Sequence, residues 1–179
     1  KPLKSPQQLL LEKPSLEFFQ GEWLTGFGWD ENQWPHDFKV HREFLDQVYP
    51  NTPVFLSRTD GHSSWVNTAA LKKLGHWDLS QYHSDIEVDA LGIPTGVLRE
   101  SAHIQALFSL PPLTDTAKKQ HLVKGAEIFN RAGFTHIRDM TSNANQWSLH
   151  QQLQDELLLH VEHFFSCENR KDFQRALQE

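Results

Sequence analysis

The chain has a single cysteine, a single methionine and two tyrosines among 179 residues, and what it lacks excludes several protein classes. Cys167 alone can form no internal disulfide, so the fold does not depend on oxidation. No apolar run approaches the roughly 18–20 residues of a membrane-spanning helix. No block of lysine and arginine occurs, and the net charge is −6. These features argue against a nucleic acid or a membrane as the partner.

Bulky apolar residues are plentiful by contrast. The chain is 38% hydrophobic and 22% charged, with twelve Phe and six Trp. This composition is typical of a globular domain of ordinary size. The first residue is Lys1, so the sequence reveals no targeting segment, and we expect a cytoplasmic protein.

Strand-like and helical runs alternate along the chain. The apolar patterns predict strands at 21–28, 54–57, 134–137 and 157–165. They predict helices at 40–48, 68–74, 100–108, 114–131, 145–156 and 171–178. Residues 75–99 depart from this alternation and predict a small hairpin inserted after the second helix. Because parallel strands need long crossovers, this alternation predicts an α/β fold with a parallel sheet.

The segment Arg58–Asn67 gathers polar side chains directly after the apolar run Pro53–Leu56. It contains an Arg, an Asp, a His, two Ser, a Trp and an Asn before the helix that begins near Thr68. In α/β barrels, reactive side chains lie in the loops that follow the strands, which favours a functional site. The alternative is a polar turn with a capping Asn or Thr.

Four segments together resemble one known family. Gly26–Asp30, Asp60–Asn67, Gly96–Glu100 and Ala132–Met140 follow one another in order. In this order and spacing they resemble the YtcJ-like branch of the amidohydrolase superfamily (amidohydrolase family 3), which includes N-substituted formamide deformylases. The resemblance covers roughly Gly21 to Phe165. It implies a partial (β/α)8 TIM barrel of the metal-dependent hydrolase type, with about four β/α units and the small β-hairpin insertion.

The resemblance also implies a function. Such enzymes hydrolyse carbon–nitrogen bonds of small-molecule amides, other than peptide bonds, with zinc or another divalent metal. The family's His-X-His pair is absent from this sequence. We therefore expect residues 1–179 to be a fragment of the catalytic barrel, inactive alone and without its own metal. An open half-barrel exposes sheet edges, which favours a homo-oligomer. The alternative is a non-catalytic scaffold or interaction domain derived from the same fold.

Candidate catalytic and substrate-binding residues lie around the polar segment. His62 could contact the substrate or polarise its carbonyl, with Asp60 or Arg58 orienting the ring; otherwise it is a buried histidine bound to a loop carbonyl. Trp29 and Trp65, with Arg58, could bind the substrate, although large aromatic residues more often belong to a core.

Candidate metal ligands are Glu100 and His163. The resemblance places Glu100 where a metal-binding carboxylate is expected, and its alternative role is a first-turn Glu favoured by the helix dipole. His163 falls at the carboxyl end of the last predicted strand. Asp139 could hydrogen-bond a metal-ligating histidine or cap a helix.

Overall fold

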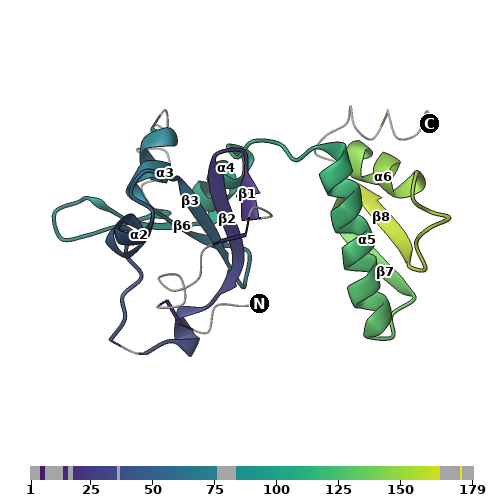
Figure 1. Cartoon of the computed structure of the whole chain (residues 1–179), viewed down its shortest axis with the longest axis horizontal. Helices are drawn as coiled ribbons and strands as arrows, with labels where there is room; N and C mark the ends of the chain where they lie inside the picture. The colour runs from purple at the N-terminus through teal and green to yellow at the C-terminus, as the bar shows by residue number, and fades with distance from the viewer. Residues whose placement is uncertain are drawn as a thin grey trace. The chain divides into compact units, whose positions relative to one another are not determined.

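The computed structural model describes residues 5–6, 14–15, 18–35, 37–75, 84–165 and 174 (Figure 1). The chain divides into two compact units, residues 1–112 and residues 113–179. The helix predicted at 171–178 lies, apart from residue 174, outside the described residues. In the part of the chain that is described, no helix combines the length and the apolar character that a membrane crossing requires.

The first unit is built on a six-stranded sheet. Its strands, in spatial order, are β1 (Phe19–Gln20), β2 (Trp23–Trp29), β3 (Val54–Arg58), β4 (Ser63–Val66), β6 (Pro94–Arg99) and β5 (Ile86–Val88). Strands β2 and β3 are parallel, and every other neighbouring pair is antiparallel. The predicted α/β class is confirmed, but the sheet of this unit is mixed, so the prediction of a parallel sheet was wrong here.

Strand β4 is the reason for this difference, because it occupies residues that were predicted to be a turn. Gly61 has a φ of 73°, and its N–H donates to the carbonyl of Arg58 at 3.0 Å, so the chain reverses there. It then returns antiparallel to β3, with Leu56 opposite Trp65. All four residues of β4 are buried. The strand begins with two serines, so β-propensity did not indicate a strand there.

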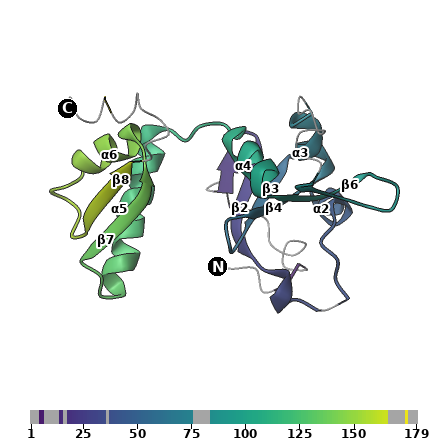
Figure 2. The ribbon, with the colours of Figure 1, turned by 180° about the vertical axis from the view of Figure 1, so that it is seen from behind.

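Helices cover both faces of this sheet (Figure 2). They are α2 (Arg42–Val48), α3 (Thr68–Lys73) and α4 (Glu100–Phe108), with a short 3-10 turn, η2 (Glu31–Gln33). Each α-helix begins and ends within two residues of its prediction. Ala70 of α3 and Ala102 of α4 pack in one core with Phe55, whereas Leu45 of α2 packs in another core with Trp65.

Within the region 75–99 the structure describes residue 75 and residues 84–99, which include β5 and β6. Strand β6 pairs with both β5 and β4, so this hairpin extends the main sheet. Gly96 makes the close packing possible, since a Cβ there would lie 2.3 Å from the carbonyl oxygen of Val66 and 2.8 Å from Arg42 Cβ. With a φ of 95°, it also adopts a conformation that favours glycine.

The second unit contains α5 (Asp115–Arg131), β7 (His136–Ser142), α6 (Ala144–Gln151) and β8 (His160–Phe165). Strands β7 and β8 are parallel and joined through α6, as the sequence predicts. Thr114 caps α5 by accepting the N–H of Ala117 at 3.2 Å, and Gly133, with a φ of 89°, follows the helix end. Helix α6 ends at Gln151, five residues before its predicted end at 156.

Candidate active site

The ends of four strands meet at one edge of the first sheet. Strands β2 and β3 are parallel, and β6 runs in the same direction because both β3 and β6 are antiparallel to β4. The carboxyl ends of β2, β3 and β6 therefore share an edge with the amino end of β4. Two backbone hydrogen bonds join these ends, from Thr59 N to Trp29 O at 3.0 Å and from Glu100 N to His62 O at 2.8 Å.

Arg58 is the hub of the charged groups at this edge. Its Nε donates to Glu31 Oε2 at 2.7 Å, its Nη2 donates to Asp30 Oδ1 at 3.3 Å, and its Nη1 donates to Asp60 Oδ2. Its guanidinium carbon lies 6.0 Å from the ring centre of Trp29. The hydrogen bond to Glu31 and then that to Asp60 raise the pKa of Arg58. Since every guanidinium nitrogen meets a carboxylate, Arg58 holds the loops after β2 and β3 together.

Asp60 and Glu100 position His62 from two sides. Asp60 Oδ1 accepts the backbone N–H of His62 at 3.0 Å, as an Asx turn does, and this bond, with Arg58, lowers the pKa of Asp60. The imidazole Nδ1 of His62 lies 3.0 Å from Glu100 Oε2. Both side chains remain accessible, with 66% of His62 and 62% of Glu100 exposed. His62 is therefore an exposed, oriented imidazole, not a buried one.

Glu100 has an unusual backbone conformation. Its φ is 38°, whereas no other non-glycine among the described residues has a positive φ. The left-handed region costs a residue with a Cβ roughly 1–2 kcal/mol. Here it aims the backbone N–H and the carboxylate of Glu100 at the same residue, His62. Strain of this kind persists where surrounding contacts impose it, and it often accompanies functional positions. Glu100 is also the first residue of α4, as its alternative role requires.

Trp29 and Trp65 lie in the core behind this edge. They are 2% and 0% exposed, and their ring centres are 6.1 Å apart. The indole N–H of Trp29 donates to the carbonyl of Leu56 at 2.8 Å. This packing agrees with the alternative that the sequence offers for both residues, a structural aromatic core, and their contact with a substrate stays a prediction.

His163 and Asp139 lie in the second unit. Ser142 Oγ donates to Asp139 Oδ2 at 2.8 Å, and the same oxygen lies 2.7 Å from His163 Nδ1. Asp139 is thus bound to a histidine through a serine. Its predicted alternative, capping of the following helix, is wrong, because the side chain of Asn143 caps α6 in a capping box with Gln146.

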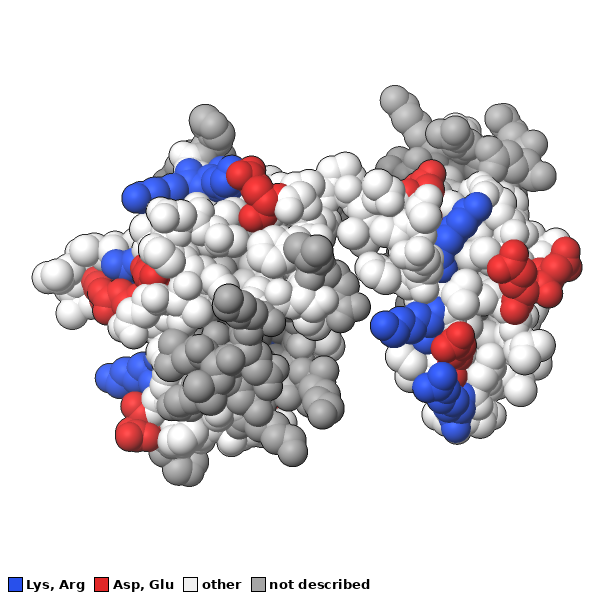
Figure 3. Space-filling view, in the orientation of Figure 1, with Lys and Arg blue, Asp and Glu red and all other residues white. Residues whose placement is uncertain are grey.

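Several polar residues at these places were not singled out from the sequence: Asp30, Glu31, His103, Ser142 and His150. His103 is 2% exposed beneath the His62 turn, where burial lowers its pKa. Arg58, the partner of Asp30 and Glu31, lies 28 and 27 residues from them, and His163 lies 21 residues from Ser142, so no spacing pattern could indicate these contacts. Within the described ranges, no group of three or more His, Cys, Asp or Glu residues is arranged to hold a metal ion. Acidic and basic side chains are interspersed over the face of each unit that Figure 3 presents.

The mixed α/β fold of this chain is similar to that of solved protein structures. The crystal structure of an uncharacterized metal-dependent hydrolase from Pyrococcus furiosus matches 97% of this chain and 34% of its own, with a TM-score of 0.62 and 22% sequence identity. At that identity the match concerns the fold alone. Residues 16–178 match the model of the amidohydrolase family, and the chain belongs to that family. The predicted resemblance is confirmed.

Two curated relatives match shorter stretches. A Bacillus subtilis (strain 168) protein named as the amidohydrolase YtcJ is 36% identical over 112 residues, which are 60% of this chain and 20% of that protein. The N-substituted formamide deformylase of Arthrobacter pascens is 33% identical over 84 residues, 46% of this chain and 16% of the enzyme. The matched stretch thus spans a fifth or less of these relatives.

The pairing of His62 with Glu100 has a measurable consequence for pH. The hydrogen bond and the charge of Glu100 raise the pKa of His62 above 6.5. Because the folded-state pKa is raised, the pair stabilises the fold fully below pH 6.5, and this contribution is lost as the pH rises through the folded-state pKa. In an NMR titration, Glu100→Gln should return the pKa toward 6.5, whereas the exposed control Glu127→Gln should not. A wild-type pKa at or below 6.5 would contradict the pairing.

Proposed function

We propose that this chain is part of a metal-dependent hydrolase that cleaves carbon–nitrogen bonds of non-peptide amides, and that the strand-end edge of the first unit belongs to its active site. One observation carries the proposal. His62, Asp60, Arg58 and Glu100, which the sequence singles out, lie at the same edge, with the strained Glu100 turned to His62. The names of the YtcJ and formamide deformylase relatives support the choice of bond.

The residues at this edge suit amide hydrolysis in part. A carboxylate and an imidazole are ligands that zinc or a similar divalent metal accepts, so Glu100 is the proposed ligand from this unit. When bound, such a metal supplies an activated water and polarises the amide carbonyl. His62 has its Nδ1 engaged by Glu100, which leaves Nε2 to contact the substrate. Asp60 fixes the turn that carries His62, and Arg58 fixes Asp60.

The same reasoning indicates an incomplete centre. A catalytic zinc site usually has three protein ligands, whereas the described residues hold no such group. We therefore propose that the remaining ligands come from other parts of a longer enzyme and that this chain alone is inactive. Within the proposal, both units belong to a partial (β/α)8 barrel, residues 75–99 are an insertion, and Trp29 and Trp65 form the wall behind Arg58. Open strand edges favour a homo-oligomer.

Elemental analysis and hydrolysis of an N-substituted formamide would test the proposal on the full-length product of the gene and on this chain. We expect hydrolysis, and a zinc ion that Glu100 binds, in the full-length protein only. Glu100→Gln should lower both at least about tenfold, since losing a ligand weakens metal binding by at least as much as losing a supporting contact. The exposed control Glu127→Gln should change neither. A full-length protein with neither metal nor hydrolysis would favour the scaffold alternative instead.

A further inference from the structure

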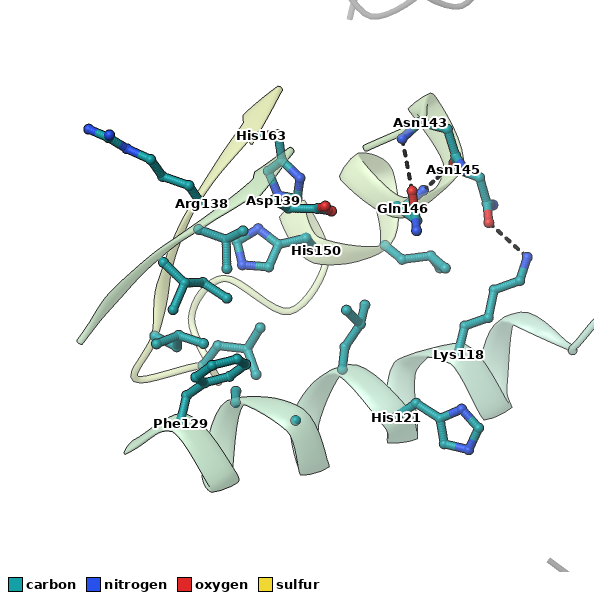
Figure 4. A pocket seen from close by; sticks show the side chains of 18 of the residues that line it. Lys118, His121, Phe129, Arg138, Asp139, Asn143, Asn145, Gln146, His150 and His163 are labelled. Atoms are coloured by element: carbon teal, nitrogen blue, oxygen red, sulfur yellow. Dashed lines mark hydrogen bonds between the residues drawn. The ribbon is translucent and has the colours of Figure 1, made fainter. Parts of the chain in front are cut away.

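The second unit has a cavity of about 670 Å³ between its helices and its sheet, which is open to solvent on one side (Figure 4). Most of its wall is apolar. The apolar lining includes Leu122, Phe129, Ile137, Leu149, Leu159 and Val161. Two histidines, His150 of α6 and His163 of β8, line it close to Asp139, and Figure 4 shows the three side chains side by side. Buried polar groups usually have a hydrogen-bond partner, so the polar atoms of His150 and His163 in this apolar cavity should have one too.

His150 is the more deeply buried of the two. It is 7% exposed, and neither of its ring nitrogens has a hydrogen-bond partner among the described residues. An imidazole always carries at least one N–H, and burying that group unpaired is costly. Its neighbour His163 has a buried Nε2 that is also unpaired. Three buried ring nitrogens of these two adjacent histidines thus lack a hydrogen bond.

Hydrogen bonding fixes which nitrogen of His163 carries the proton. The Ser142 hydroxyl donates its proton to the Asp139 carboxylate at 2.8 Å, so its oxygen is left to accept from His163 Nδ1 at 2.7 Å. The proton of neutral His163 therefore sits on Nδ1, and the unpaired Nε2 presents a lone pair. Orientation of a histidine by a carboxylate behind it is the usual support of a metal-ligating imidazole.

The spacing of the rings fits a shared ion. The ring centres of His150 and His163 are 4.9 Å apart, with an angle of 63° between the planes. With zinc–nitrogen bonds of about 2.0–2.1 Å and ligands at tetrahedral angles, two imidazole centres lie about 5 Å apart. Burial lowers the pKa of both histidines, so both are uncharged at neutral pH, as metal ligands must be.

We propose that His150 and His163 together bind one transition-metal ion of the zinc type in this cavity. The Asp139–Ser142 pair positions His163, and the two remaining coordination positions face the cavity, open to water or to a small ligand. The proposal rests on residues of the second unit alone, and it stands whether or not the hydrolase proposal holds.

A second histidine pair in the same unit provides a matched control. His136 and His160 lie opposite each other on β7 and β8 with ring centres 5.1 Å apart, close to the spacing of the proposed pair. Both are exposed, and neither lines the cavity that His150 and His163 share, although both line a smaller pocket on another side of His150. His121 lines that cavity from α5 and serves as a second control.

Calorimetric titration of the 179-residue chain with Zn²⁺, and absorption spectra with Co²⁺, would test the proposal. His150→Gln and His163→Gln should each weaken the tightest site at least about tenfold, and Ser142→Ala should weaken it about 10-fold as well, within the range known for supporting residues. His160→Gln and His121→Gln should change it less than twofold. Loss of the tightest site in His160→Gln, or its persistence in the His150→Gln/His163→Gln double variant, would overturn the proposal.

A measurement on the wild-type chain tests the site even where a variant fails to fold. In the wild-type chain, Zn²⁺ should shift the ring ¹⁵N resonances of His150 and His163 Nε2 before those of His136 and His160. If the exposed pair responds first, or if no histidine of the cavity responds, the proposed site does not exist.

Discussion

Trp65→Ala is expected to lower the free energy of unfolding by about 3–5 kcal/mol, the cost of truncating a large aromatic residue in a core. Trp65 is fully buried at the centre of a ring cluster. Its ring centre lies 5.8–6.1 Å from those of four neighbours, which are Trp29, Trp34, Phe38 and Phe44. Such edge and tilted contacts add to the burial of apolar area. Urea unfolding followed by far-UV circular dichroism measures the change.

Two controls make this test specific. Trp65→Phe keeps most of the ring contacts and loses no hydrogen bond, because the indole N–H of Trp65 has no partner, so it should cost about 1–2 kcal/mol. Phe27→Ala removes a ring that is 68% exposed and should cost less than about 0.5 kcal/mol. A loss below about 1 kcal/mol for Trp65→Ala would show that the ring is no core element, which would favour its predicted contact with a substrate.

The outcome at Trp65 illustrates what the sequence could and could not predict. The stop at Pro111 and Pro112 and the cap at Thr114 located α4 and α5 almost to the residue, because such signals lie next to the helices in sequence. Strand β4 carried no such signal. Its two serines become buried only because β3 and β6 flank it on both sides, and although β3 directly precedes it, β6 follows only after α3 and β5. Pairing between distant strands is a tertiary effect that overrides local propensity.

The candidate site divides in the same way. The segment Arg58–Asn67 indicated where polar side chains concentrate, and its Asp60 and His62 do lie together at the strand-end edge. Their partners could not be read from it. Glu31 reaches Arg58 from 27 residues away, and Glu100 reaches His62 from 38 residues away. Only the order of the strands brings these carboxylates to one edge. A local motif therefore predicted where the polar side chains gather, and the fold determined their charge partners.

Asn67 shows how much a single residue of that segment contributes to the fold. Its buried side chain makes four hydrogen bonds, with Oδ1 accepting from Val54 N at 3.0 Å and from Ala70 N at 2.9 Å. Its Nδ2 donates to the carbonyls of Tyr49 at 2.8 Å and Thr52 at 2.9 Å. Asn67 thus caps α3, as the sequence suggests, and also ties the start of β3 to the end of the α2 segment.

Asn67→Ala is expected to lower the free energy of unfolding by about 3–4 kcal/mol, because it leaves several buried backbone groups unpaired and removes a helix cap. Asn67→Ser restores the cap to Ala70 alone and should recover about 1 kcal/mol. Asn143→Ala removes the cap of α6 at an exposed position and should cost only about 1 kcal/mol. Urea unfolding compares the three variants. Equal losses for Asn67→Ala and Asn143→Ala would mean that Asn67 acts as a cap and nothing more, and that the bonds to β3 and the α2 segment contribute no net stability.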